Sequence, residues 1–196
     1  MRFWLAWMAS LCLAAETVAY LIEPGRGDRF ALKVEKTGLM SGKKHLFLFE
    51  RCRGRLHYDA AAPERSSGEL VVESASIACK DTWVKPKELV KIQRAAVEDM
   101  LAAQLYPEVI FRSTGAMRKP EGGCEVRGNL TIRDRTMPVA VAVFPETGRG
   151  GELRFRGHAV VRLRDYGLKP PSTLLGAIGT KNEVRLGFVV TARPQR

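Results

Sequence analysis

The stretch that decides the fold is Leu153-Arg-Phe-Arg-Gly-His-Ala-Val-Val-Arg-Leu163. Apolar or small residues occupy every second position of this stretch, and polar residues occupy nearly all the positions between them. Successive side chains of a β-strand point to opposite faces of a sheet, so this period of two predicts a strand. One face is dry (Leu153, Phe155, Gly157, Ala159, Val161, Leu163) and the other is wet (Arg154, Arg156, His158, Arg162, Arg164). Such a pattern is typical of antiparallel sheets that bury one side.

The same period recurs along the chain from residue 20 onward. Apolar alternation is found at Phe30, Leu32 and Val34, at Leu70 and Val72, at Val126, Leu130 and Ile132, and at Val184, Leu186, Phe188 and Val190. Turn-forming residues cluster between these runs, at 59–67, 119–123, 134–138 and 147–151. About eight short strands joined by turns favour a sandwich or a closed barrel, and closure would remove exposed sheet edges.

One segment departs from the period of two. Between Pro86 and Leu105, apolar residues are spaced three and four apart, which predicts an amphipathic helix. Pro86 suits the first turn of a helix, and Pro107 follows its expected end. We expect this helix to cover one mouth of the barrel; a lid or a partner-binding helix is the alternative.

Composition places the chain among globular proteins of one domain. It has 196 residues, of which 45% are hydrophobic and 27% are charged, and this excludes a disordered chain. The formal charge is +11, from 32 Lys and Arg against 21 Asp and Glu, so an anionic partner is a reasonable expectation.

The first 19 residues have the pattern of a secretory signal peptide. Arg2 precedes an apolar run from Phe3 to Ala15, and small residues follow. We expect cleavage after Ala19, with a cut after Ala15 or retention as a membrane anchor as the alternatives. The expected organisation is a signal peptide over 1–19 and one domain over 20–196, in the periplasm or otherwise outside the cytoplasm.

No arrangement of residues in the sequence points to catalysis. The common nucleophile, zinc-protease, phosphate-loop and dinucleotide motifs are missing from the sequence. The three histidines have no cysteine or carboxylate at ligand spacing, and Asp81 and Asp165 look isolated. We therefore expect a protein that is not an enzyme and holds neither metal nor cofactor. Three cysteines remain after signal cleavage, and their pairing is open: Cys52, Cys79 and Cys124.

Arginines recur at alternate positions and so share the outer faces of predicted strands: Arg51, Arg53 and Arg55; Arg133 and Arg135; Arg154 and Arg156; Arg162 and Arg164. A solvated exterior explains them most simply. The functional alternative is attraction to anionic lipid headgroups or to nucleic acid. A signal peptide and an aromatic content of 8% favour the membrane surface over nucleic acid.

Several motifs, in order, resemble those of the YceI-like family of periplasmic lipid- or polyisoprenoid-binding domains. They are Tyr20-Leu-Ile-Glu-Pro24, Gly54-Arg-Leu-His-Tyr-Asp59, Leu105-Tyr-Pro-Glu-Val-Ile-Phe-Arg-Ser-Thr114, Val126-Arg-Gly-Asn-Leu-Thr-Ile-Arg133 with Met137-Pro-Val139, Arg164-Asp-Tyr-Gly-Leu168 and Asn182-Glu-Val184. The chain departs from the family pattern in the helical stretch, at Asp134, and in the loop after residue 168.

The resemblance implies an eight-stranded antiparallel, lipocalin-like barrel. Its internal tunnel would hold a polyisoprenoid or an isoprenoid quinone. The inward-facing residues expected to line the tunnel are Phe30, Leu32, Val34, Leu70, Val72, Val109, Phe111, Leu130, Ile132, Val161, Leu163, Leu186 and Phe188. An anionic headgroup would meet Lys169, Lys181 or Arg26 at the mouth. The alternative is a filled barrel that binds the membrane or an envelope partner through its arginines.

Overall fold

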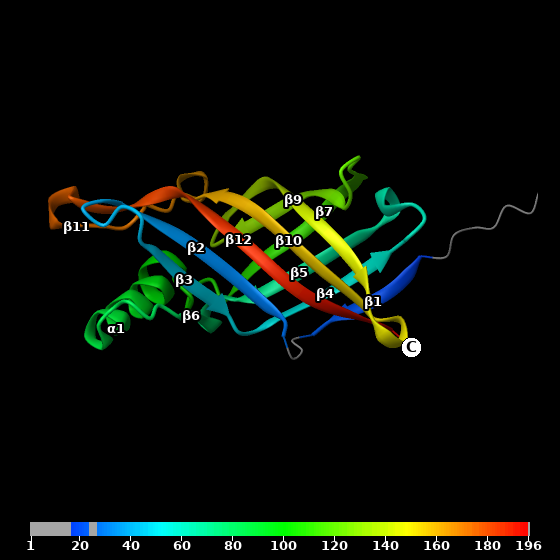
Figure 1. Ribbon diagram of the computed structural model, residues 1–196, viewed down its shortest axis with the longest axis horizontal. Coiled ribbons are helices and arrows are strands. Elements are labelled where there is room, and N and C mark those ends of the chain that lie inside the picture. Colours follow the sequence, from blue (N-terminus) through cyan, green and yellow to red (C-terminus); the bar gives the residue numbers. More distant parts are fainter. Residues whose placement is uncertain (1–16, 24–26, 196) are drawn as a thin grey trace, which may run out of the picture.

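A computed structural model describes residues 17–23 and 27–195, so residues 1–16 of the expected signal peptide and Arg26, one of the expected headgroup contacts, lie outside the described residues (Figure 1). The strands are β1 (Val18–Ile22), β2 (Arg29–Gly38), β3 (Lys44–Phe49), β4 (Cys52–Tyr58), β5 (Ser67–Glu73), β6 (Ile77–Cys79), β7 (Glu108–Arg118), β8 (Cys124–Ile132), β9 (Arg135–Thr147), β10 (Leu153–Arg162), β11 (Ser172–Thr173) and β12 (Ile178–Pro194). The α-helix is α1 (Pro86–Arg94), and short 3₁₀ turns occur at Pro63–Arg65, Ser74–Ser76, Arg149–Gly151, Leu163–Tyr166 and Leu174–Gly176.

The strands form an antiparallel sheet that closes on itself, which confirms the barrel implied by the family resemblance and decides between the sandwich and the barrel that the alternation left open. The circuit β1-β4-β5-β7-β8-β9-β10-β12 returns to β1, which gives a barrel of eight strands. The long strand β12 makes the closure: residues 178–189 pair with β2, and Ala192–Pro194 pair with β1 on the same edge. Strands β2, β3 and β6 extend the wall beyond the circuit toward α1.

Two expected boundaries are corrected by the structure. The turn expected over 134–138 is tighter, because β9 begins at Arg135 and Arg133 takes a left-handed φ of 56°. The helix is shorter than Pro86–Leu105: α1 gives way to a π-helical turn at Ala95–Met100, and Ala102 with φ 47° breaks the helical path. Leu105 is consequently 77% exposed instead of lying on the buried face. No helix in the described ranges is long and apolar enough to cross a membrane.

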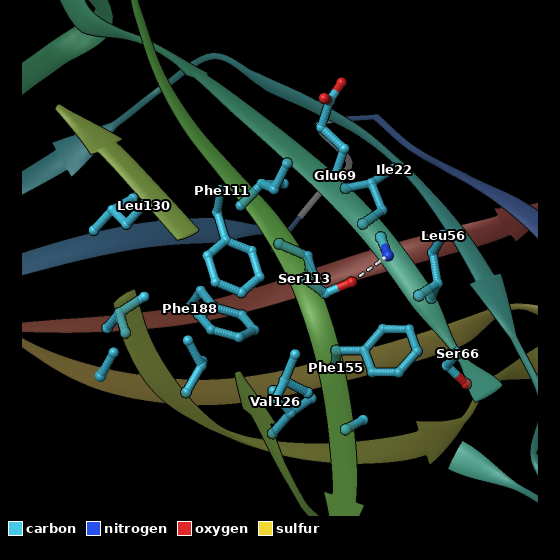
Figure 2. A pocket seen from close by; sticks show the side chains of 18 of the residues that line it. Ile22, Leu56, Ser66, Glu69, Phe111, Ser113, Val126, Leu130, Phe155 and Phe188 are labelled. Atoms are coloured by element: carbon cyan, nitrogen blue, oxygen red, sulfur yellow. Dashed lines mark hydrogen bonds between the residues drawn. The ribbon is translucent and has the colours of Figure 1, made fainter. Parts of the chain in front are cut away.

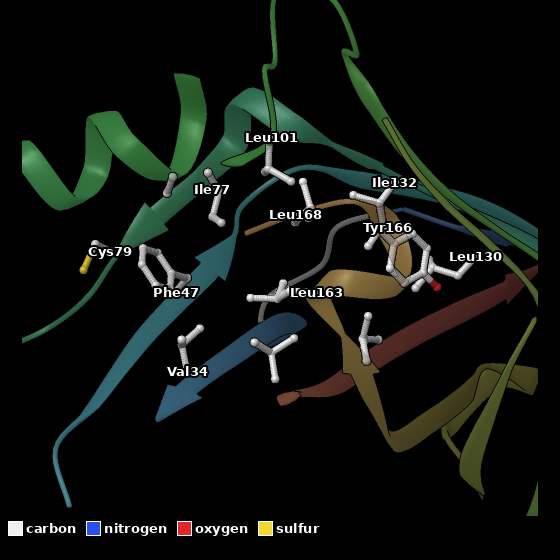
Figure 3. Close-up of a cluster of buried hydrophobic side chains, with 13 residues drawn as sticks. Val34, Phe47, Ile77, Cys79, Leu101, Leu130, Ile132, Leu163, Tyr166 and Leu168 are labelled. Atoms are coloured by element: carbon white, nitrogen blue, oxygen red, sulfur yellow. The ribbon is translucent and has the colours of Figure 1, made fainter. Parts of the chain in front are cut away.

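The interior is packed most tightly at the end of the barrel that α1 covers. Thirteen buried residues form a cluster there, which includes Phe47, Ile77, Leu163, Tyr166 and Leu168 (Figure 3). Leu89, Ile92 and Met100 from the helical segment pack against this cluster. The Gln93 side chain joins α1 to the free edge of β6, since its Oε1 accepts from the Cys79 N–H at 2.7 Å and its Nε2 donates to the Ile77 carbonyl at 2.5 Å. The helix thus closes this mouth of the barrel.

Candidate binding cavity

The barrel holds a cavity of about 200 Å³ on the side of the packed cluster away from α1. Only Leu130 and Val161 of the thirteen packed-cluster residues reach its wall. A second cluster, of six buried residues, contributes four residues to the wall: Ile22, Phe30, Phe155 and Val190. One half of the barrel is therefore filled with side chains, and the other half leaves space.

Nine of the thirteen residues expected to line a tunnel lie on the cavity wall: Phe30, Leu70, Val72, Val109, Phe111, Leu130, Val161, Leu186 and Phe188. The other four belong to the packed end: Val34, Ile132 and Leu163 are members of its cluster, and Leu32 packs against it. All thirteen share the inward face, but those nearer α1 meet the helix and the 3₁₀ turn Leu163–Tyr166 instead of open space.

The wall also contains apolar residues that the sequence analysis did not assign to the tunnel lining. They are Ile22, Leu56, Val126, Val139, Val141, Val143, Phe155 and Val190. Val139, Val141 and Val143 alternate along β9 in the same period of two that marked the other strands. Aromatic rings pack against one another in this region: Phe30 stacks on Phe188 at 5.4 Å, and Tyr58 meets Phe155 edge-on at 5.7 Å between ring centroids.

The cavity approaches the surface where β5 and β7 part. Their described pairing runs from Glu73–Glu108 to Glu69–Arg112 and goes no further, although β7 continues to Arg118. Residues 59–66, here called the strap, cross in front of the parted strands, and the 3₁₀ turn Pro63–Arg65 packs against β7. Pro63 and Ser66 of the strap line the cavity.

Most polar residues on the cavity wall come from the strap and the adjoining strands: Arg55, Ser66, Ser67, Glu69 and Ser113, in addition to Tyr58 and Cys124. Ser66, Glu69 and Ser113 are labelled in Figure 2. Lys169 and Lys181, which the sequence analysis offered as headgroup contacts, are not part of the wall. Lys181 instead pairs with Glu35 at 2.5 Å. Hydroxyls, together with the exposed Arg55 and the half-buried Glu69, are the groups that could meet a polar headgroup.

Several outward arginines are paired with glutamates, most of them on neighbouring strands. Arg51 pairs with Glu73, and Arg53 pairs with Glu108 at 2.5 Å. Further pairs between neighbouring elements are Arg112–Glu69, Arg156–Glu146, Arg162–Glu183 and Arg193–Glu152, and Arg127–Glu125 is a pair within β8. Exposed pairs add little stability, but they cancel charge along the barrel wall. The wall is consequently a weaker site for anions than the arginine pattern alone suggests.

The expectation that every histidine is isolated from carboxylates was wrong for His45. Its Nδ1 lies 2.5 Å from Asp81 Oδ2, and both residues are buried. Cys79 stands beside them, and burial raises the pKa of its thiol to about 11. Cys52, Cys79 and Cys124 are all free thiols in the structure.

The fold and cavity define a closed antiparallel barrel with an apolar internal pocket. Residues 28–192 match the YceI-like domain, so the chain belongs to the YceI-like family, as its motifs indicated.

Curated relatives include a UPF0312 protein of Pseudomonas savastanoi, 28% identical over 132 residues. That match spans 63% of this chain and 63% of the relative's length. A UPF0312 protein of Vibrio cholerae is 29% identical over 171 residues, which cover 84% of this chain and 85% of that protein.

Solved structures share the fold. BcnA of Burkholderia cenocepacia superposes with a TM-score of 0.64 at 21% identity, covering 83% of this chain and 96% of BcnA. A polyisoprenoid binding domain from Saccharophagus degradans superposes with a TM-score of 0.58 at 11% identity, covering 92% of this chain and all of that domain.

Proposed function

We propose that the protein binds a long apolar chain, a polyisoprenoid or an isoprenoid quinone, in the barrel cavity and performs no chemistry on it. The observation that carries this proposal is the cavity wall, which is predominantly apolar and has most of its polar residues near the opening between β5 and β7. Burial of an apolar chain contributes about 0.8 kcal/mol per methylene before the costs of association. The relative from Saccharophagus degradans, described as polyisoprenoid-binding, supports the same ligand class.

The size of the cavity bears on how such a chain is held. Ligand pockets commonly measure about 300–1,000 Å³, whereas this cavity measures about 200 Å³. A short chain fits inside, and we infer that a longer chain extends through the opening beside the strap. Its polar end would then lie among Ser66, Ser67 and Ser113, where a hydroxyl or a quinone carbonyl finds hydrogen-bonding groups.

Mass spectrometry of the lipids extracted from natively purified protein tests the ligand. The expected result is a polyprenyl or quinone species in stoichiometric amount. The proposal would be overturned if the folded protein carried no lipid and also bound none of the added prenols described next. Geraniol, farnesol and geranylgeraniol can then be titrated into delipidated protein. We expect affinity to rise at least tenfold on the first five-carbon extension, and by less once the cavity is full.

We further propose that the protein contacts anionic membrane, through one end of the barrel instead of through the arginines of its wall. Residues 33–44, 80–94 and 169–181 lie toward the end marked by β11 and α1 in Figure 1. These 40 residues hold eleven Lys and Arg but three Asp and Glu. The remaining 156 residues hold 21 basic and 18 acidic residues, so eight of the eleven net charges belong to these three segments.

Exposed leucines project from the same end. Leu39 is 78% exposed, Leu174 is 66% exposed and Leu175 is fully exposed. The Leu39 N–H donates to the Ala177 carbonyl at 3.0 Å, so the two loops that carry these leucines are joined. Leu174 and Leu175 both have φ above 50°, a left-handed conformation that costs a non-glycine residue about 1–2 kcal/mol. Apolar side chains at the centre of a basic surface suit insertion between anionic headgroups.

Sedimentation with vesicles tests this contact. We expect binding to phosphatidylglycerol vesicles, weaker binding to phosphatidylcholine vesicles, and loss of binding in L174D/L175D. Val160→Asp is the matched control, because Val160 is an exposed apolar residue on the barrel wall. The proposal would be contradicted if Val160→Asp lost as much vesicle binding as L174D/L175D. It would also be contradicted if vesicle binding did not depend on lipid charge or on salt.

We also propose that the protein resides in the periplasm, because its sequence begins with the pattern of a secretory signal peptide.

The structure bears on the position of signal cleavage. Strand β1 begins at Val18, and the Ala19 carbonyl accepts from the Gln195 N–H at 2.8 Å. A cut after Ala19 would shorten β1 by two of its five residues, whereas a cut after Ala15 would keep the strand whole. We therefore propose the cut after Ala15, and the intact mass of the protein from a periplasmic extract distinguishes the two.

A further inference from the structure

Three potential metal ligands come together at the packed end of the barrel, apart from the cavity. Cys79 pairs with Phe47 across β3 and β6, and His45 lies two residues from Phe47 on the same face. Asp81 lies two residues beyond Cys79. The ligand atoms of His45, Cys79 and Asp81 all lie within 4.8 Å of one another. Figure 3 shows Cys79 beside Phe47 near α1.

The surroundings hold these side chains in place. Each of the three residues is at most 9% exposed. Asp81 Oδ1 accepts from the Leu46 N–H at 2.8 Å, which leaves Oδ2 directed at His45. The Trp83 ring stacks on the His45 ring at 5.3 Å between centroids, and its Nε1 donates to the Lys44 carbonyl at 3.1 Å. Metal sites depend on this kind of outer support to orient their ligands.

We propose that His45, Cys79 and Asp81 form a binding site for a zinc ion. Zinc binds thiolate sulfur at about 2.3 Å and imidazole nitrogen or carboxylate oxygen at about 2.0–2.2 Å, in tetrahedral geometry. Ligand atoms on such a tetrahedron lie about 3.3–3.7 Å apart. The His45–Asp81 pair must open from 2.5 Å, and any ligand pair near the 4.8 Å limit must close by about 1 Å. We expect rotation of the three side chains to supply these changes.

The donor set favours zinc over magnesium or calcium, because those hard cations prefer oxygen ligands throughout. The fourth position is left for water. Such a site would tie β3 to the segment that leads into α1 and would stabilise the closed end of the barrel. The positive charge of Lys36, on β2, interacts electrostatically with Asp81 and would therefore disfavour a cation bound to that carboxylate.

Cobalt titration of the reduced, full-length mature protein tests the site. We expect one equivalent of Co²⁺ to bind with the absorption bands of tetrahedral cobalt and a sulfur-to-cobalt charge-transfer band, and Zn²⁺ to displace it. Cys79→Ser should abolish the charge-transfer band. Cys52→Ser and Cys124→Ser are matched controls that should retain it. Zinc should also raise the melting temperature of the wild-type protein and of both controls.

Further variants keep the proposal testable if Cys79→Ser folds poorly. Asp81→Asn preserves an acceptor for the Leu46 N–H and should weaken cobalt binding at least tenfold. Lys36→Met removes the opposing charge and should strengthen it. The proposal is overturned if the wild-type protein gives no charge-transfer band, or if the band depends on Cys52 or Cys124 instead of Cys79. Neither readout involves the lipid cavity, so the outcome is independent of the proposed ligand.

Discussion

The Gly68 N–H donates to the Ser113 hydroxyl at 2.7 Å, where a continuous sheet would offer it a backbone carbonyl of β7 (Figure 2). This bond lies next to Glu69–Arg112, the last backbone pair between β5 and β7. On the other edge of β7, its pairing with β8 shifts register between Ser113 and Gly115, at the same level of the strand. One side-chain bond therefore spans a seam in the barrel wall. We infer that the seam is the route by which a ligand enters the cavity, because opening it breaks few backbone hydrogen bonds.

The strap beside this seam depends on Asp59. Asp59 Oδ1 accepts from the N–H groups of Ala61 and Ala62, both at 2.9 Å. Asp59→Ala would leave both donors without this acceptor, so we expect it to cost about 1–3 kcal/mol of unfolding free energy. Asp59→Asn keeps an oxygen acceptor and should cost less. Urea denaturation measures the unfolding free energy of both variants. Equal losses in Asp59→Ala and Asp59→Asn would show that the strap is not stabilised by these two hydrogen bonds.

The same substitution should change ligand exchange. With the strap loosened, a bound fluorescent prenol analogue should leave Asp59→Ala faster than it leaves the wild-type protein. Stopped-flow dilution measures this rate. An unchanged rate in a folded variant would argue against entry beside the strap.

Phe111 tests the cavity directly. Its ring points inward beside Phe188 in Figure 2, so Phe111→Arg would place a charge against an apolar wall. An unpaired buried charge costs several kcal/mol, and each 1.4 kcal/mol changes affinity tenfold. We therefore expect farnesol binding to fall by at least about 100-fold, as followed by calorimetry.

Two further variants separate lost binding from lost folding. Phe144→Arg is the control, because Phe144 is 39% exposed and stacks on His158 outside the barrel. It should bind like the wild-type protein. Phe111→Met should fold and retain most of the affinity. Tight binding by a folded Phe111→Arg would remove Phe111 from the binding site.

Much of the fold follows from the sequence because burial on one side of a strand leaves a period of two. That period identified β10 and the inward set from β2, β5, β8 and β12. The period could not separate the nine cavity residues from the other four. Val34 and Phe30 occupy equivalent inward positions in the sequence pattern, and only the packing of α1 near Val34 distinguishes them.

The contact between His45 and Asp81 was missed for another reason. They are 36 residues apart, and only the pairing of β3 with β6 brings them together.

Gly157 leaves room for the aromatic wall of the cavity. A Cβ at this position would lie 2.3 Å from the Phe188 ring and 2.6 Å from the Ala142 carbonyl oxygen. The ring could shift into the cavity, but the carbonyl belongs to the neighbouring strand and could not. Gly157→Ala should therefore destabilise the protein by about 1–3 kcal/mol, as overpacked cores do. Gly115→Ala is the matched control in β7, since a Cβ there meets nothing within 4 Å. Thermal denaturation should show a lower melting temperature for the first variant alone.

Glu35 links three strands near the basic end and predicts a pH dependence. Its carboxylate lies 3.2 Å from Lys44 of β3 and 2.5 Å from Lys181 of β12. Hydrogen bonds to Lys181 and Lys44 lower its pKa from 4.5 to about 2. Because the folded state binds the proton less readily than the unfolded state, the stabilising contribution is complete above about pH 4.5. It is lost as the pH falls through about 2.

Glu35→Gln should accordingly lower the urea midpoint at pH 7, and the difference from the wild-type protein should shrink between pH 4.5 and pH 2. Added salt should reduce the difference at pH 7, because the pair is exposed to solvent. Glu121→Gln, in the exposed turn between β7 and β8, is the control and should leave the midpoint unchanged at every pH. A wild-type advantage over Glu35→Gln that persisted below pH 2 would contradict the assignment, since the protonated carboxyl no longer attracts either lysine.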